Sequence, residues 1–220
     1  MTRRLEVLLS HVKGPVAADI GCDHALLAAA AVKTGRAEKV YACDIAEGPL
    51  ERARATIEKE GVTDSVIPLL SDGLAALPEV CDQIIIAGMG GETILSILEA
   101  GSSRMDEETR LLLSPHTKAP VLRNWLQDHG WKICLEQFVK DRGRYYPVIE
   151  ACRCSQETDS RERLKPEELL FGSHPVHDEI WQLYLAHEKE KLCRLMESVP
   201  AERKEEVHGK LKLLESIGKV

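Results

Sequence analysis

Short apolar segments alternate with helical segments along most of the chain, and this alternation limits the fold more than any other feature. The segments that we predict to be buried strands are 16–20, 39–43, 66–70, 81–87 and 110–114. Strands that alternate with helices form right-handed βαβ units in a mostly parallel sheet. Continuously apolar strands, such as residues 83–87, are typical of a sheet that is covered on both faces. The sequence therefore predicts an α/β fold.

The rest of the chain predicts an edge hairpin and a helical appendage. Residues 132–139 and 145–152 alternate in polarity and are joined across Arg142-Gly143, which favours an antiparallel strand pair at the edge of the sheet. Residues 176–217 carry apolar side chains at helical spacing, interrupted at Pro200, which indicates an antiparallel, coiled-coil-like helix pair. We expect a sheet domain of residues 1–157 and an appendage of residues 158–220.

Composition excludes several classes of protein. Of the 220 residues, 44% are hydrophobic and 30% are charged, and no apolar run is long enough to span a bilayer. The N-terminal segment lacks a small-residue cleavage site, so we expect a cytoplasmic protein without a membrane partner. The net charge of −7 argues weakly against nucleic acid as a partner, although a local basic patch can dominate one surface.

The seven cysteines are scattered, and no pair has Cys-x-x-Cys spacing. A zinc site would need more ligands close by than the sequence offers. We therefore expect free thiols and no metal site.

Acidic residues and glycines follow four of the predicted strands. These segments are Asp19 to His24, Asp44, Asp72-Gly73 and Gly88 to Gly91. Each alone is also an ordinary turn or helix cap, but the carboxyl ends of parallel strands share one edge of the sheet, where ligands bind. Asp44 lies 23 residues after Gly21, where an acid accepts hydrogen bonds from both ribose hydroxyls of a nucleoside. Asp72 is suited to the exocyclic amine of an adenine ring.

The first of these turns indicates which nucleoside cofactor binds. A pyrophosphate would need Gly-x-Gly-x-x-Gly, whereas this turn is Gly21-Cys-Asp23-His24 with a further acid at Asp19. Carboxylates repel a pyrophosphate but attract the ammonium and sulfonium groups of S-adenosylmethionine. The charges favour a methyltransferase. The alternatives are a nicotinamide or flavin oxidoreductase with a modified turn, and an inactive scaffold that keeps the cofactor fold.

Four segments together resemble the TrmK family, the bacterial tRNA (adenine-22-N1)-methyltransferases. They are Asp19-Ile-Gly-Cys-Asp-His24, Ile86-Ala-Gly-Met-Gly-Gly91, Arg123-x-Trp125-Leu126 and Phe171-Gly172. The resemblance implies a Rossmann-like class I methyltransferase with a seven-stranded sheet, S-adenosylmethionine as cofactor, and methylation of N1 of adenine 22 in tRNA. The chain has Ser114-Pro115-His116 where family members have Gln-Pro-Asn, and Gly172-Ser-His-Pro175 where they have Gly-Pro.

The resemblance also implies roles for individual residues. Asp19 and Gly21 would hold the methionine part of the cofactor, Asp44 the ribose, and Asp72 with Gly73 the adenine. The other predicted cofactor residues are His24, Ile45, Ala87, Gly88, Met89 and Gly90. The Gly88 to Gly91 turn replaces the Asn-Pro-Pro-Tyr-like turn of amino-group methyltransferases, which fits attack by a ring nitrogen. Asp23 is the predicted catalytic residue, because it could accept a hydrogen bond from the target adenine's exocyclic amine.

A target base inside tRNA must leave its stack to reach the cofactor, so phosphate contacts are expected to offset the cost. The candidate RNA-binding residues are Arg3, Arg4, Arg123, Arg142 and Arg144, with Lys189, Lys191 and Arg194 on the C-terminal helices. Tyr145 and Tyr146 could stack on a base or belong to the core of an edge strand. We expect a monomer or a weak dimer with tRNA as its partner.

Overall fold

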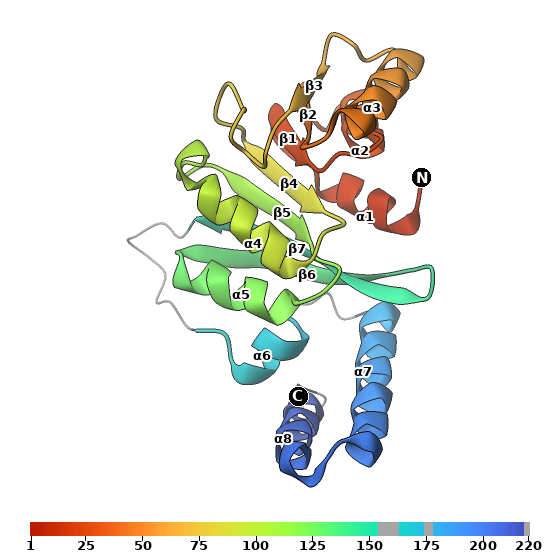
Figure 1. Ribbon diagram of the computed structural model, residues 1–220, viewed down its shortest axis with the longest axis vertical. Helices are drawn as coiled ribbons and strands as arrows, with labels where there is room; N and C mark the ends of the chain where they lie inside the picture. Colours follow the sequence, from red (N-terminus) through yellow and green to blue (C-terminus); the bar gives the residue numbers. More distant parts are fainter. Residues whose placement is uncertain (154–162, 174–177, 218–220) are drawn as a thin grey trace.

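The computed structural model describes residues 1–153, 163–173 and 178–217. Seven strands form one sheet in the order β3-β2-β1-β4-β5-β7-β6 (Figure 1). The strands are β1 (Val16–Ile20), β2 (Lys39–Asp44), β3 (Val66–Leu70), β4 (Gln83–Ala87), β5 (Arg110–Ser114), β6 (Trp131–Asp141) and β7 (Arg144–Arg153). β1 to β5 pair in parallel, whereas β7 is antiparallel to both β5 and β6. The predicted mostly parallel sheet with an antiparallel edge hairpin is confirmed.

Helices cover both faces of the sheet. One face carries α1 (Arg3–His11), α2 (Leu26–Lys33) and α3 (Glu47–Glu60), and the other carries α4 (Gly91–Ala100), η1 (Ser102–Arg104) and α5 (Ala119–Asp128). Alternate residues of β4 enter opposite cores: Ile85 packs with α1 to α3, and its neighbours Ile84 and Ile86 pack with α4 and α5. A strand buried on both faces must be apolar at successive positions, which explains the Ile-Ile-Ile run.

Local sequence signals set several element boundaries. Thr2 caps α1 by accepting a hydrogen bond from the backbone N–H of Leu5 at 3.3 Å. α3 ends at Gly61, whose φ of +68° is in the left-handed region that favours glycine. The β6–β7 hairpin turns through Arg142 and Gly143, both with positive φ, as a two-residue turn of this handedness requires.

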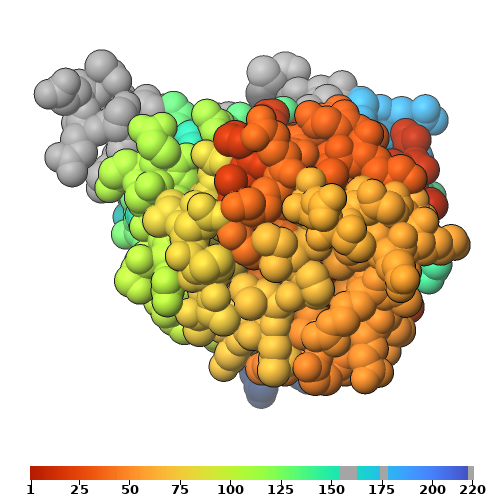
Figure 2. Space-filling model, turned by 90° about the horizontal axis from the view of Figure 1, so that it is seen from above, coloured from red at the N-terminus to blue at the C-terminus, as the bar shows by residue number. Residues whose placement is uncertain are grey.

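The C-terminal appendage consists of α6 (Pro166–Phe171), α7 (Glu179–Ser198) and α8 (Ala201–Ile217). α7 and α8 lie antiparallel (Figure 1) and enclose a small apolar core with α6, so the predicted helix pair is confirmed. α6 was not predicted, and the expected boundary between residues 157 and 158 lies outside the described residues. Seen from above, the face over β1 to β3 is formed by the N-terminal half of the chain, with the blue C-terminal helices only at its margin (Figure 2).

Aromatic side chains join the appendage to the sheet. The ring of Phe138 on β6 stacks on Tyr184 of α7, with 4.0 Å between ring centroids, and lies 5.3 Å from the ring of Trp181. Tyr145 on β7 extends the cluster to Tyr184 at 5.9 Å. Tyr145 therefore belongs to this joint, whereas the next residue, Tyr146, points to the opposite face of the strand.

Arg123 is not an RNA contact, and this prediction is wrong. Its side chain on α5 is 1% exposed and forms an ion pair with the fully buried Glu136 of β6, with Nη2 and Oε1 2.6 Å apart. Arg123 also donates to the backbone oxygen of Leu169 on α6 at 2.8 Å, and Glu136 accepts from the backbone N–H of Ser173. The pair thus links the sheet domain to the appendage. Sequence alone gave an arginine on a helix but not the buried acid opposite it.

The expectation of free thiols is wrong for one pair of cysteines. Cys134 and Cys152 form a disulfide between β6 and β7, whereas Cys22, Cys43, Cys81 and Cys193 are free. The register of β6 against β7 shifts between Ile133 and Leu135, so Cys134 lies in a bulge, two residues after Lys132, the register partner of Cys152. Spacing in the sequence does not reveal such a bulge. Cys154 lies outside the described residues. No helix in the described ranges is both long and apolar enough to cross a bilayer.

We predict that Arg123→Ala lowers the free energy of unfolding by about 3–5 kcal/mol, because it leaves the carboxylate of Glu136 buried without a partner. Urea denaturation measures this change. Arg163→Ala is the control, since the Arg163–Asp128 pair is exposed and its loss is expected to cost less than about 1 kcal/mol. Equal losses for the two variants would contradict a structural role for the buried pair.

Candidate functional site

The order of the strands reverses at β1, which pairs with β2 on one side and with β4 on the other. In open α/β sheets this reversal opens a crevice at the carboxyl ends of the strands, where ligands bind. The predicted cofactor residues lie in the four segments that follow β1, β2, β3 and β4, or at the last residues of these strands. The topology therefore brings them to one edge of the sheet, as the sequence predicted.

The turn after β1 is held tightly against β2. The backbone N–H groups of Gly21 and Cys22 both donate to the carbonyl oxygen of Cys43, at 2.8 and 2.9 Å. Gly21 has φ of +74°, and the non-glycine residues Asp23 and Ala25 also have positive φ, at 49° and 51°. Such conformations cost on the order of 1 kcal/mol each and concentrate at functional sites. The strain marks this turn as a candidate ligand contact.

Asp19 is a buried carboxylate without a positive partner among the described residues. It is 5% exposed at the end of β1, and burial raises its pKa to about 7. A hydrogen bond from the backbone of Ala28 lowers the pKa, and the nearby charge of Asp44 raises it further. A cationic group that reached this turn would stabilise the ionised form. Asp19 is thus suited to an ammonium group of a ligand.

Asp44 and Asp23 are arranged by hydrogen bonds around the same turn. One carboxylate oxygen of Asp44 accepts from the backbone N–H of Asp23 at 3.3 Å, and the other accepts from Ala46 at 3.2 Å. The carboxylate of Asp23 accepts from the Arg52 guanidinium at 2.8 Å and lies 3.7 Å from the ring of His24. Sequence reasoning missed Arg52, because nothing in one sequence distinguishes it from the other charged residues of α3.

Apolar side chains are exposed beside the acids at this edge. Ile45, directly after Asp44, is 69% exposed, and Leu70 at the end of β3 is 51% exposed. Asp72 is exposed in the next turn, which is shaped by Ser71 donating to the carbonyl oxygen of Gly73 at 2.8 Å. Apolar surfaces next to a few directed polar groups suit a planar ring such as adenine.

The turn after β4 closes over the turn after β1. A Cβ atom on Gly21 would lie only 2.1 Å from the Cε of Met89, so the Met89 side chain covers the glycine. The same turn is tied to the segment after β5, because His116 donates its backbone N–H to the carbonyl oxygen of Met89 at 2.8 Å. Gly21, Met89 and His116 are thus continuous along the sheet edge.

The remaining basic candidates differ in their surroundings. Arg3 is exposed and lies 3.8 Å from Glu6, whereas Arg4 is half-buried against Tyr146 and His116. Arg142 and Arg144 are exposed in the β6–β7 hairpin, which extends beyond the sheet on the side of the N-terminus (Figure 1). Lys189, Lys191 and Arg194 form ion pairs with glutamates of their own helix pair, so they are weaker candidates.

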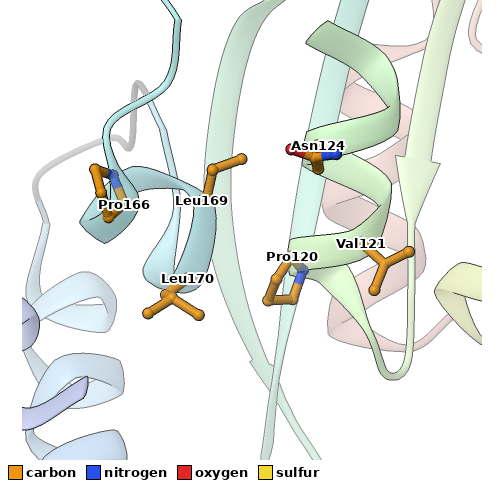
Figure 3. A pocket seen from close by; sticks show the side chains of 6 residues that line it. All are labelled: Pro120, Val121, Asn124, Pro166, Leu169 and Leu170. Carbon is orange, nitrogen blue, oxygen red and sulfur yellow. The ribbon is translucent and has the colours of Figure 1, made fainter. Parts of the chain in front are cut away.

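A groove of about 460 Å³ lies between α5 and α6, and none of the residues that line it belongs to the turns after β1 to β4 (Figure 3). It is lined by Pro120, Val121, Asn124, Pro166, Leu169 and Leu170. None of these side chains can ionise, so the groove offers no group for acid–base or nucleophilic chemistry. The strand-end edge remains the candidate functional site.

Comparison with known proteins agrees with this location. The family described as "Methyltransferase domain" matches residues 1–149, which include every strand-end residue described above. The chain belongs to this family. The match favours the methyltransferase interpretation of the acidic edge over the oxidoreductase one.

The chain is similar in sequence and in structure to proteins of the TrmK family. It is 35% identical over 153 residues to the Bacillus subtilis tRNA (adenine(22)-N(1))-methyltransferase, a match that spans 69% of this chain and 64% of that protein. The crystal structure of B. subtilis TrmK is 26% identical with a TM-score of 0.85, covering 99% of this chain and 98% of that one. M. capricolum TrmK, solved with S-adenosyl-homocysteine, is 26% identical with a TM-score of 0.86, covering 99% and 97%.

The family match and the TrmK structures cover different parts of the chain. The family match ends at residue 149, within β7, whereas the two TrmK structures match nearly the whole chain. The helical appendage is therefore part of the architecture that this protein shares with TrmK and is additional to the general methyltransferase domain.

We predict that, in the absence of ligand, ionisation of Asp19 makes the protein less stable as the pH rises. The unfolded carboxyl group ionises near pH 4, and the folded one near pH 7. Between these values the unfolded state binds fewer protons, so the free energy of unfolding falls by up to about 1.4 kcal/mol per pH unit. Urea titrations at several pH values measure the fall. Asp19→Asn should lack this component, and an unchanged pH dependence in that variant would contradict the assignment.

Proposed function

We propose that the protein is an S-adenosylmethionine-dependent methyltransferase that modifies N1 of adenine 22 in tRNA. The carrying observation is the acidic sheet edge, where the buried carboxylate of Asp19 lies beside the glycine turn at Gly21 without a positive partner among the described residues. The B. subtilis relative is named for this reaction, and M. capricolum TrmK was solved with the demethylated cofactor. The matched stretch is less than two thirds of the B. subtilis protein.

The residues at the edge fit S-adenosylmethionine. Asp19 and the turn at Gly21 receive the methionine end, where a positive ammonium balances the carboxylate. Asp44 receives the ribose hydroxyls, with its carboxylate already oriented by the backbone of Asp23 and Ala46. The adenine ring lies against Ile45, with Asp72 and Gly73 at its polar edge. His24, Ala87, Gly88, Met89 and Gly90 complete the surroundings.

The cofactor, when bound, supplies an electrophilic methyl group. Adenine N1 carries an in-plane lone pair, so no proton has to be removed before it attacks, and the product base carries a positive charge. The protein's task is therefore to align the base and to exclude water. Asp23 accepts a hydrogen bond from the exocyclic amine, which makes N1 more electron-rich, and Arg52 holds the Asp23 side chain in place.

The tRNA is bound outside the acidic edge. The target adenine leaves its stack, at a cost of roughly a few kcal/mol, and phosphate contacts offset this cost. After Arg123 is excluded, the predicted arginines that remain are Arg3 and Arg4 of α1 and the exposed Arg142 and Arg144 of the β6–β7 hairpin. We further propose that the protein acts in the cytoplasm as a monomer or weak dimer.

We predict that the purified protein forms 1-methyladenosine in bulk tRNA, measured by nucleoside analysis after incubation with labelled S-adenosylmethionine. Asp23→Asn should lower kcat by about tenfold to a hundredfold, because it removes a charged hydrogen-bond acceptor. Asp64→Asn, an exposed acid in the segment before β3, is the matched control and should behave as the unmodified protein. No product at all would overturn the proposed function in favour of a scaffold. A rate for Asp23→Asn equal to that of the control would overturn only the role of Asp23.

We also predict that affinity for S-adenosylmethionine rises between pH 5.5 and 7. With a pKa of about 7, Asp19 is mostly protonated at pH 5.5 and about half ionised at pH 7, and only the ionised carboxylate pairs with the ligand's ammonium group. Isothermal titration calorimetry in two buffers of different ionisation enthalpy measures the affinity and the released proton. Asp19→Asn should bind more weakly and without proton release. Proton uptake on binding would contradict this pairing.

A further inference from the structure

A cluster of side chains next to the candidate active site is not explained by cofactor binding. Arg4 of α1 lies with its guanidinium carbon 5.0 Å from the centre of the Tyr146 ring, and its Nη1 donates to Nε2 of His116. The rings of His116 and Tyr146 are 5.0 Å apart. The cluster thus joins three segments that are distant in sequence. They are α1, the segment after β5, and β7.

This arginine lies directly at the turn after β4. A Cβ atom on Gly88 would be 3.6 Å from Nη2 of Arg4, so the guanidinium lies in contact range of the glycine. His116, its hydrogen-bond partner, is tied to the same turn through the carbonyl oxygen of Met89. The other side of this turn covers Gly21, where the cofactor is proposed to bind. Arg4 therefore lies at the border between the cofactor edge and the hairpin.

The protonation state of His116 follows from its partner. An arginine side chain only donates hydrogen bonds, so Nε2 of His116 must accept, and the ring is neutral with its proton on Nδ1. Partial burial and the charges of Arg4 and Arg144 lower the pKa of His116 in the same direction. A neutral histidine can support Arg4 without adding a second positive charge beside it.

The guanidinium of Arg4 has hydrogen-bond donors that its contact with His116 does not use. Among the described residues, no carboxylate forms an ion pair with Arg4, although the charge of Asp141 acts on it from β6. Arg4 has five N–H donors, of which His116 uses one and the Tyr146 face uses none. A half-buried, oriented arginine with free donors is suited to an oxyanion, and phosphate matches its planar geometry.

We propose that Arg4 binds the phosphate group that flanks the target nucleotide of the RNA, and that Tyr146 and His116 are positioning residues for its guanidinium. The inference rests on the proposed function, which requires the base to leave its stack and enter the edge beside Gly88. Anchoring the adjacent phosphate at Arg4 fixes the backbone of the displaced nucleotide. Arg3, one residue earlier, is exposed and near Glu6, so it contributes only to the general charge of the surface.

The matched variants are Arg4→Ala and Arg3→Ala, which remove the same charge from the same helical turn. With tRNA as substrate, Arg4→Ala should lower kcat/KM about tenfold or more, and Arg3→Ala by no more than about threefold. Affinity for S-adenosylmethionine and the urea midpoint should be unchanged in both variants, which separates RNA binding from folding. Tyr146→Leu should follow Arg4→Ala in direction, and Tyr146→Phe, which keeps the ring, should retain activity.

A modified substrate identifies the contacted group. In tRNA that carries an uncharged methylphosphonate at the linkage 5′ or 3′ of the target adenosine, the unmodified enzyme should lose activity at one of the two linkages. Arg4→Ala should lose nothing further there, because the two changes remove the same interaction. An Arg4→Ala effect that persists in full on both modified substrates, or that equals the Arg3→Ala effect, would overturn the assignment. Absence of 1-methyladenosine with the unmodified enzyme and normal tRNA would instead overturn the proposed function and this inference with it.

Discussion

The parallel pairing of β1 with both β2 and β4 is the constraint on which the site depends. Because the strand order reverses at β1, the turns that follow β1 and β4 face each other across the sheet edge, and Met89 reaches Gly21. The same reversal leaves Asp19 at the end of a strand with neighbours on both sides, where water cannot solvate it. An energetically costly carboxylate and a strained turn persist here because the rest of the sheet holds them in place.

The charged side chains near this edge of the sheet form two regions. Asp19, Asp23, Asp44 and Asp72 follow the strands on one side of the crevice, whereas Arg4, Arg142 and Arg144 lie on the side of α1 and the hairpin. The protein carries a net charge of −7, yet these three arginines place positive charge on the side of α1 and the hairpin. This separation suits the proposed ligands, because a positively charged cofactor is attracted to the acidic region and a polyanionic RNA to the basic one.

The sheet and the grouping of the candidate site residues at its edge could be predicted from sequence because their signals are local. Apolar runs such as residues 83–87 mark strands, and an acid or a glycine after each run marks its carboxyl end. Contacts between distant elements carry no such signal. The Arg123–Glu136 pair, the Cys134–Cys152 disulfide and the contact between Arg4 and His116 depend on which segments the fold brings together. For this reason Arg123 looked like a surface cation, and the support of Arg4 could not be anticipated.

The two adjacent tyrosines of β7 lie on opposite faces of the strand, one toward the appendage and the other toward the candidate site. Tyr145 packs on α7, and Tyr146, pointing the other way, lies under Arg4. A slip of β7 by one residue against β5 and β6 would exchange the two rings between the faces of the strand, and would disrupt both regions together. The register of β7 therefore sets the contact with α7 and the support of Arg4 at the same time.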